Sequence, residues 1–204
     1  MAKLNKLRTS NLPDAVLDRR QAVPALIGRA ADFLIVTGLA GTAQELSAMT
    51  DCSPGVFANG GAMGAALAMG LGLALAQPKR RVLAITGDGE LLMNVGTLAT
   101  IALQNPRNLA IVCVDNGHYG ETGNQDSHTG LGVRLDTIAT GSGIPIVHIV
   151  NTEADLAEAQ RLIRSDDGPC FILLRVKEGP PQKVKRNLVP HLERDKFRAA
   201  LLGA

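Results

Sequence analysis

One carboxylate and one carboxamide stand at matching places in a chain that is otherwise rich in apolar residues. Asp88 lies between two glycines in TGDGE, and Asn116 ends the stretch IVCVDN. Each follows an apolar run that predicts a buried strand. The carboxyl ends of neighbouring parallel strands meet at one edge of a sheet, so we expect both side chains to reach one ion. Mg²⁺ accepts such oxygen ligands together with phosphate oxygens, and a backbone carbonyl from the turn at Gly117 and His118 is a third candidate ligand.

Three glycine-containing junctions are predicted at the same edge, namely TGLAGT, NGGAMG and TGDGE. Any one of them alone is most simply a tight turn that leads into a helix. Together they outline a rim whose backbone N–H groups can bind a phosphate. The sequence has neither G-x-x-x-x-G-K-[ST] nor a G-x-G-x-x-G with a ribose-binding acid after it, so the usual nucleotide fingerprints are missing. Since TGDGE has no lysine, a metal ion is the expected counter-charge for a phosphate.

The elements that must position these residues follow from the alternation of apolar runs with helical patterns. This alternation predicts an α/β fold, a three-layer α/β/α arrangement around a mainly parallel sheet of about six strands. A single domain is expected over 1–204, with an N-terminal helix within 1–31, broken at Pro24, and a C-terminal extension over 177–204. The predicted strands are 33–37, 56–58, 82–86, 109–114, 146–149 and 171–176, and the predicted helices are 42–48, 63–76, 91–103, 135–141 and 153–163.

Composition excludes several classes of function. The 204 residues are 46% hydrophobic and carry a net charge of +2. The sequence contains no basic stripe with interleaved aromatic residues, so nucleic-acid binding is not expected. The N-terminus lacks a signal-peptide pattern, and the apolar stretch AMGAALAMGLGLALA is too short to span a membrane and predicts a buried helix. The three cysteines have no metal or disulfide spacing, which favours a reducing, cytoplasmic location.

The motif that begins at Asp88 and ends at Asn116 resembles the signature of thiamine diphosphate (ThDP) enzymes. That signature runs from Gly87-Asp88-Gly89 to a pair that is usually two asparagines, and here the pair is Asp115-Asn116. The departure falls on Asp115, whereas Asn116 occupies the position that binds the metal in the family. The resemblance covers residues 33–176 and implies the ThDP-binding fold, with ThDP and Mg²⁺ as cofactors.

The resemblance also implies roles for individual residues. Asp88, Asn116 and the His118 carbonyl would hold Mg²⁺ against the diphosphate, and Met63 would support the cofactor in its bent shape, although a core methionine is the simpler interpretation of Met63 alone. Relatives often have Ser where Glu90 stands. The full set of residues implied to contact the cofactor is Gly38, Gly61, Ala62, Met63, Gly87, Asp88, Gly89, Glu90, Asn116, His118, Tyr119 and Gly120.

A catalytic glutamate is expected from a second chain. In the family, a Glu on a separate pyrimidine-binding domain activates the cofactor, and this chain has room for one such α/β domain only. Glu45, Glu90 and Glu121 all belong to the diphosphate-binding domain. The resemblance therefore implies a hetero-oligomer in which a partner subunit with the pyrimidine domain supplies the activating Glu at a shared active site.

Stretches such as GDGELLMNVGTLATIA resemble the decarboxylases of sulfopyruvate and phosphonopyruvate, which implies a small anionic 2-oxo acid as substrate. An acetolactate synthase-like carboligase, a non-catalytic ThDP-binding module and a nucleotide-binding domain are the alternatives. In the polar loop over 117–130, His118, Glu121 and His128 are candidate catalytic residues that would transfer protons or bind the substrate. A solvated loop explains the same residues equally well.

Overall fold

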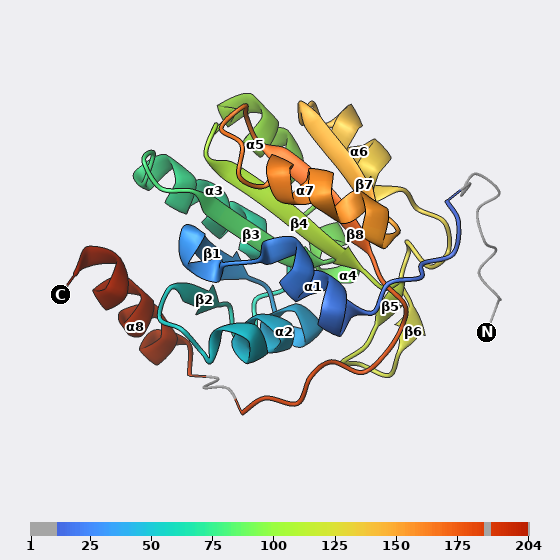
Figure 1. The fold of residues 1–204 in the computed structure, drawn as a ribbon, viewed down its shortest axis with the longest axis horizontal. Coiled ribbons are helices and arrows are strands. Elements are labelled where there is room, and N and C mark those ends of the chain that lie inside the picture. The colour runs from blue at the N-terminus through green and yellow to red at the C-terminus, as the bar shows by residue number, and fades with distance from the viewer. Residues whose placement is uncertain (1–11, 186–188, 204) are drawn as a thin grey trace.

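The structure is a computed structural model that describes residues 12–185 and 189–203. The beginning of the predicted N-terminal helical segment, 1–11, lies outside the described residues, as do 186–188 and 204 of the C-terminal extension. The described chain forms helices on both sides of a central sheet (Figure 1). This arrangement confirms the predicted three-layer α/β/α fold.

The central sheet has six strands in the order β2-β1-β3-β4-β8-β7, and every neighbouring pair is parallel (Figure 1). All six correspond to predicted strands, with ends that differ by one residue at most. The strands are β1 (Leu34–Thr37), β2 (Val56–Ala58), β3 (Val82–Gly87), β4 (Leu109–Asp115), β7 (Ile146–Val150) and β8 (Cys170–Arg175).

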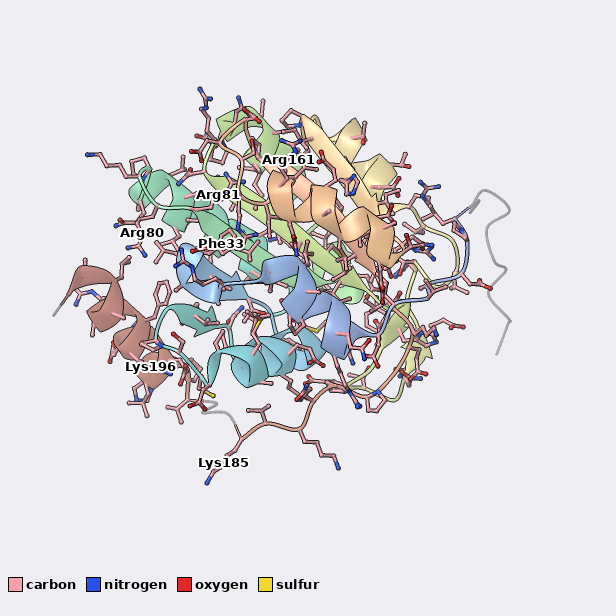
Figure 2. The ribbon with its side chains drawn as sticks, viewed as in Figure 1. Phe33, Arg80, Arg81, Arg161, Lys185 and Lys196 are labelled. Atoms are coloured by element: carbon pink, nitrogen blue, oxygen red, sulfur yellow. The ribbon has the colours of Figure 1, made fainter. Side chains whose placement is uncertain are left out.

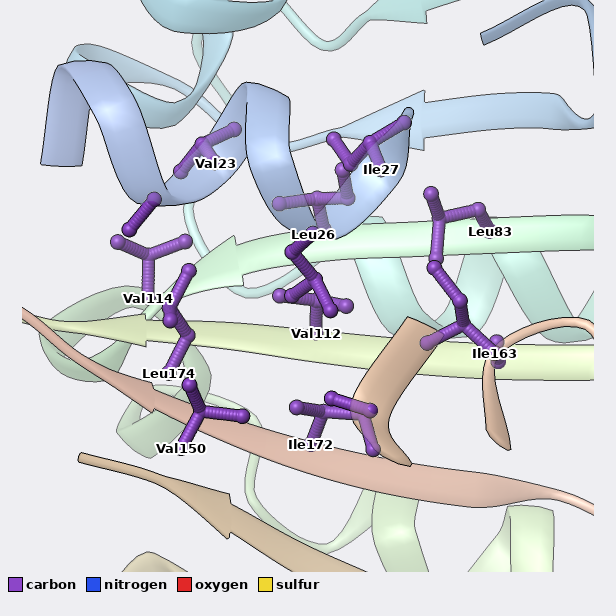
Figure 3. Packing of buried hydrophobic residues seen from close by; sticks show 14 of the residues in the cluster. Val23, Leu26, Ile27, Leu83, Val112, Val114, Val150, Ile163, Ile172 and Leu174 are labelled. Atoms are coloured by element: carbon purple, nitrogen blue, oxygen red, sulfur yellow. The ribbon is translucent and has the colours of Figure 1, made fainter. Parts of the chain in front are cut away.

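The strands are mainly apolar because both faces of the sheet are covered. Successive side chains point to opposite faces, so Leu83 and Ile85 of β3 belong to one buried cluster while Val82 and Ala84 belong to the other. Figure 3 shows the first cluster, in which Leu26 of the first helix meets side chains of the central strands. Each face contributes about 25 cal/mol per Å² of buried apolar surface.

Helices α1, α2 and α7 contribute side chains to the first cluster, and α3, α5 and α6 contribute to the second. The last helix, α8, lies against the edge strand β2, where the rings of Phe57 and Phe197 are 5.9 Å apart. The helices are α1 (Arg19–Ile27), α2 (Ala40–Thr50), α3 (Ala66–Ala76), α4 (Asp88–Leu92), α5 (Thr97–Gln104), α6 (Leu135–Gly141), α7 (Leu156–Leu162) and α8 (Pro190–Leu202), with short 3-10 turns at Ala30–Asp32 and Glu153–Asp155.

The predicted break at Pro24 is wrong, because Pro24 lies inside α1, which runs from Arg19 to Ile27. Proline removes one backbone hydrogen bond from a helix, at a cost of about 3 kcal/mol. Two neighbours on the same helix, Val23 and Ile27, are at most 1% exposed. Burial of each such side chain contributes about 1.5–3 kcal/mol, so packing on the sheet offsets the lost bond.

Two other predicted helices have different limits. The helix predicted over 63–76 begins only at Ala66, because Gly64 has a φ of +80°, which a right-handed helix does not contain. The helix predicted over 91–103 is two helices, α4 and α5, since the chain turns at 93–96 and Asn94 donates its side-chain N–H to the Gly64 carbonyl at 3.1 Å.

The apolar stretch around α3 is a covered helix, as predicted, with Leu67 and Ala74 buried in the second cluster. Among the described residues, no helix combines the length and the apolar character that crossing a bilayer requires. The loop over 117–130 contains a two-stranded antiparallel hairpin that the sequence did not predict, formed by β5 (His118–Tyr119) and β6 (Gln125–Asp126). Its strands have two residues each, which is too short for a periodic pattern.

Candidate active site

A cavity of about 480 Å³ lies at the carboxyl ends of β3 and β4. Most of the residues predicted to contact a cofactor line it, although they come from three separate parts of the sequence. These lining residues are Met63, Gly87, Asp88, Gly89, Glu90, Asn116, His118, Tyr119 and Gly120, and the candidate catalytic residue Glu121 lines the cavity with them. Gly38, Gly61, Ala62 and His128 were also predicted to belong to the site, and they do not line this cavity.

The register of two adjacent strands brings Asp88 and Asn116 together. Gly87 of β3 is paired with Val114 of β4. Asp88 begins α4 directly after β3, and Asn116 is the first residue after β4. The outer atom of the Asn116 amide consequently lies 3.2 Å from Oδ1 of Asp88 and 3.0 Å from the carbonyl oxygen of His118. The predicted proximity of the two ends of the motif is thus confirmed.

The Asn116 amide has two orientations with different consequences. With its nitrogen toward Asp88, it donates hydrogen bonds to Asp88 and to the His118 carbonyl. With its oxygen there, the amide oxygen lies 3.2 Å from Asp88 Oδ1 and 3.0 Å from the His118 carbonyl oxygen, and neither contact contains a proton. Adjacent ligands of octahedral Mg²⁺, at about 2.0–2.1 Å from the ion, are themselves about 3 Å apart. The three groups therefore fit a magnesium ion, and the amide can satisfy the other two groups when no ion is bound.

Two hydroxyl groups from the polar loop hold the Asp88 carboxylate. Oδ2 of Asp88 accepts hydrogen bonds from Ser127 Oγ at 2.5 Å and from Thr129 Oγ1 at 2.8 Å, which leaves Oδ1 facing Asn116. Asp88 is 2% exposed, and burial raises its pKa although both hydroxyls lower it. A cation at Oδ1 would offset this cost. The sequence did not single out Ser127 or Thr129, because loop closure over 39 residues gives no local signal.

Asp115 takes the place of the first asparagine of the usual pair, and the structure shows how a carboxylate is accommodated there. Its Oδ1 accepts hydrogen bonds from the Gly117 N–H at 3.0 Å and from Thr129 Oγ1 at 2.7 Å. Burial, and then the charge of Asp88, raise the pKa of Asp115 to about 6. Two buried carboxylates thus share the Thr129 hydroxyl, which can donate its single proton to only one of them.

Glu90 is buried beside the first glycine junction. A Cβ added to Gly38 would lie 1.8 Å from Oε2 of Glu90, so the carboxylate occupies the space that a side chain at position 38 would need. Glu90 is 5% exposed, its Oε1 has no hydrogen-bond partner among the described residues, and burial raises its pKa. Gly38 therefore contacts a residue that lines the cavity, Glu90, although it does not line the cavity itself.

The candidate catalytic residues of the polar loop lie in different places. His118 and Glu121 line the cavity, whereas His128 does not. His118 is half-buried, with Nδ1 2.8 Å from the Asn116 carbonyl and Nε2 3.3 Å from an Asp126 carboxylate oxygen. His128 is exposed, and its Nδ1 lies 3.4 Å from the Tyr119 hydroxyl. Gly89 contacts the ring of Tyr119 so closely that a Cβ would lie 2.3 Å from it. The proton-transfer roles of His118, Glu121 and His128 stay predictions.

The glycine turn before α3 places Met63 at the cavity, where its side chain is 37% exposed. Asn59 Nδ2 donates to the Ala62 carbonyl at 2.8 Å and holds this turn. A large methionine exposed in a cavity differs from the core methionine that Met63 alone would predict. Its position suits a group that supports a bound molecule.

A second wall of the cavity was predicted only in part, because the junction TGLAGT includes the start of α2 while the other two segments were missed. It consists of the start of α1, the start of α2 and the connector 178–181. Arg19 lies in this wall, donates from Nη2 to the Gly179 carbonyl at 2.6 Å, and forms an ion pair with Glu45 at 3.6 Å. Arg20 donates to the Pro180 carbonyl at 2.8 Å and at 3.2 Å. The consecutive arginines at the start of α1, Arg19 and Arg20, are the sequence feature that could have indicated this wall.

This fold and this pair of polar strand ends agree with the comparison to known families. Residues 40–174 match the family model described as thiamine pyrophosphate enzyme, C-terminal TPP binding domain. Thiamine pyrophosphate (TPP) is another name for ThDP. The chain therefore belongs to the thiamine pyrophosphate enzyme family, of which it contains the C-terminal TPP-binding domain.

Within that family, two named relatives are similar over most of this chain. The sulfopyruvate decarboxylase subunit beta of Methanothermobacter thermautotrophicus is 38% identical over 164 residues, which cover 80% of this chain and 84% of that subunit. The phosphonopyruvate decarboxylase of Streptomyces hygroscopicus is 35% identical over 187 residues, which cover 91% of this chain and 46% of that enzyme. The chain thus spans most of a separate subunit and about half of a longer decarboxylase.

A solved structure shares the fold. An X-ray structure described as a thiamin diphosphate-dependent enzyme of Mycobacterium smegmatis matches 86% of this chain with a TM-score of 0.65 and 23% identity. The match covers 35% of the solved chain. At this identity the likeness concerns the fold alone, and it supports the strand order described above.

Proposed function

We propose that this chain is the diphosphate-binding subunit of a ThDP- and Mg²⁺-dependent decarboxylase that acts on a small anionic 2-oxo acid. The observation that carries this proposal is the position of the Asn116 amide, 3.2 Å from Asp88 Oδ1 and 3.0 Å from the His118 carbonyl oxygen, at the wall of a cavity. Their chemistry suits a hard cation. Their place at the strand ends, next to the start of α4, suits a diphosphate.

Several predicted site residues have defined tasks in this proposal. Asp88, Asn116 and the His118 carbonyl hold Mg²⁺, while the N–H groups of Gly89 and Glu90 bind the diphosphate. Met63 supports the bent cofactor, and the carbonyl of Gly61 accepts a hydrogen bond from its aminopyrimidine. The cofactor, when bound, supplies the carbanion chemistry that 2-oxo acid decarboxylation requires, and the protein supplies orientation and proton positions.

The active site is shared with a partner subunit in our proposal. All glutamates that line the cavity belong to this diphosphate-binding domain, and Glu45, which accepts the Gln182 N–H at 3.1 Å, does not line it. The name of the Methanothermobacter relative, a subunit beta, also supports a partner. We assign the activating Glu to that partner and place the complex in the cytoplasm.

For the substrate, we favour a three-carbon 2-oxo acid with a second anionic group at C3, such as sulfopyruvate or phosphonopyruvate. The named relatives support this choice because the chain spans 84% of a sulfopyruvate decarboxylase subunit. A carboligase of the acetolactate synthase type shares the cofactor, and its product would appear in the same assay. A ThDP-binding module without turnover is the remaining alternative.

The test is to assay the chain alone and together with its partner subunit, with ThDP and Mg²⁺ present. The partner is sought as a small protein encoded next to this chain, with a Glu at the end of an early strand and no GDG motif. We expect CO₂ release from sulfopyruvate or phosphonopyruvate only with the pair. Substantial turnover by the chain alone would refute the shared site, and acetolactate formation from pyruvate would favour the carboligase.

A further inference from the structure

Arg19 is a buried cation whose bonding is incomplete. The residue is 9% exposed and lines the cavity, and its Nε has no hydrogen-bond partner among the described residues. The ion pair with Glu45 joins Nε and Oε1 at 3.6 Å, which is too long for a hydrogen bond. Burial lowers the pKa of Arg19, although the charge of Glu45 raises it. An unsatisfied buried guanidinium is costly, so an additional partner would stabilise it.

The wall around Arg19 offers a second source of positive potential. Helix α2 starts at Ala40, has no side-chain hydrogen bond at its N-cap and has no acidic residue in its first turn. Its first residues, 40–42, line the cavity together with Arg19. The N-terminus of a helix of this length carries roughly half a positive charge. An anion between α2 and Arg19 would therefore interact with both.

Gly41 creates the space for the guanidinium. A Cβ at position 41 would lie 2.6 Å from Nη1 of Arg19. Gly41 lies in the first turn of α2 and has no positive φ, so backbone conformation does not require glycine there. Alanine in a helix is favoured over glycine by about 1 kcal/mol. The glycine at this position is thus explained by the contact with Arg19.

A second arginine with a largely buried side chain, Arg81, has hydrogen-bond partners. Arg81, labelled in Figure 2 near the start of β3, donates to the Ile163 carbonyl at 2.8 Å and to the Arg107 carbonyl at 2.7 Å. Its guanidinium is fully used in holding two loops. Among the described residues that line the cavity, Arg19 is the sole lysine or arginine. It is therefore the group best placed to bind an anion directly.

We infer that Arg19 and the start of α2 form a second anion subsite, distinct from the Asp88–Asn116 metal position, that binds a tetrahedral oxyanion. The inference rests on the proposed function, in which two ligands bring such a group into the cavity. One is the terminal phosphoryl group of ThDP, and the other is the sulfonate or phosphonate at C3 of the substrate. Both present oxygens that match the N–H pattern of a guanidinium.

The experiment uses the chain purified with its partner and compares four variants. Arg19→Met removes the cation, and Arg20→Met is its control, because Arg20 also binds the connector but is exposed and does not line the cavity. Gly41→Ala displaces the guanidinium and keeps its charge. Gly72→Ala is the control for it, because a Cβ on this α3 glycine meets nothing within 4 Å.

Two binding constants and one kinetic comparison decide the result. Calorimetry gives the Kd of ThDP at saturating Mg²⁺, and the Kd of 3-sulfopropanoate, an unreactive probe for the C3 anion, in the ThDP-loaded complex. The third readout is KM for sulfopyruvate against KM for pyruvate. Because charge-assisted hydrogen bonds are strong, we expect the affinity for the affected ligand to fall by about 10-fold or more in Arg19→Met and Gly41→Ala. In both controls we expect the affinity to change by no more than about twofold.

A weaker Kd for ThDP in both test variants assigns the subsite to the cofactor. A weaker Kd for 3-sulfopropanoate and a raised KM for sulfopyruvate, with the KM for pyruvate unchanged, assigns it to the substrate. The inference is overturned if neither Kd changes, or if Arg20→Met produces the same loss as Arg19→Met. If the unaltered pair decarboxylates no 2-oxo acid, the proposed function fails, while the two calorimetric results still decide the role of Arg19.

Discussion

The two walls of the cavity are built in opposite ways. The wall at β3 and β4 holds the buried acids Asp88, Glu90 and Asp115, and burial raises the pKa of each. The wall at α1 and α2 holds Arg19, whose pKa burial lowers. In both walls, burial disfavours the charged form of the side chain. Both walls therefore carry charges that a bound ligand would compensate, a cation on one side and an oxyanion on the other.

The difference between the walls lies in how their residues are connected along the chain. The acidic wall is formed by consecutive strands of one strand–helix–strand unit, whose ends the parallel register places side by side. The basic wall depends on contacts between distant segments, such as Arg19 with Gly179. A short motif can record the first kind of wall, whereas the second kind becomes visible only when the chain is folded.

The largest effect is expected at the acidic wall. Asp88→Ala removes the anionic ligand of the proposed metal position, and we expect Mg²⁺-dependent binding of ThDP to weaken by about 100-fold or more, since hard cations need carboxylate oxygens. Calorimetry of the complex with and without Mg²⁺ measures this. Asp166→Ala is the control, because Asp166 is 77% exposed and pairs with Arg81, which precedes β3, at the opposite end of the strand from the cavity. Undiminished binding would remove Asp88 from the metal position.

This comparison also ranks the two walls. We expect Asp88→Ala to weaken ThDP binding more than Arg19→Met, because the first change removes a metal ligand and the second removes direct hydrogen bonds only. The reverse order would mean that the diphosphate is held chiefly by the basic wall.

A smaller effect is expected from Gly38→Ala. The new Cβ would lie 1.8 Å from Glu90 Oε2, so the Glu90 carboxylate must move, and the cavity that Glu90 lines is the open direction. A carboxylate there opposes an anionic diphosphate, and we expect the Kd of ThDP to rise by about 10-fold. The double variant Gly38→Ala with Glu90→Ala should bind ThDP as Glu90→Ala alone does. Independent, additive effects in this cycle would show that the two residues are not coupled.

The smallest effect concerns stability without ligands. Burial and the charge of Asp88 raise the pKa of Asp115 to about 6, above about 3.9 for an unfolded chain. A raised acid pKa contributes stability that is complete below about pH 4 and is lost as the pH rises through about 6. Asp115→Asn removes that dependence and keeps an acceptor for the Gly117 N–H.

We expect Asp115→Asn to raise the free energy of unfolding of the Mg²⁺-free chain by about 2 to 3 kcal/mol near pH 7. The gain over the unaltered chain should vanish near pH 4. Urea unfolding in EDTA across this pH range measures both quantities. A gain that is equal at all pH values would show that the titration of Asp115 is not its source.

Prediction from sequence succeeded where a single pattern of apolar residues extends over a whole strand or helix. The six strands and their parallel arrangement followed from apolar runs such as 109–114, because a strand with both faces buried has no polar positions. It failed where a single contact decides the backbone. Pro24 was taken as a break although packing keeps it inside α1, and the turn at 93–96 depends on the bond from Asn94 to Gly64.

The sequence by itself predicted that Asp88 and Asn116 lie close together, because each follows an apolar run that predicts a strand, and the carboxyl ends of parallel strands meet at one edge of a sheet. It also determined the family through the same motif. Only the tertiary structure decided which loop hydroxyls hold Asp88, where the Glu90 carboxylate lies and that Arg19 faces the cavity. These contacts join residues far apart in the chain, and their energies depend on burial, which no local pattern of residues records.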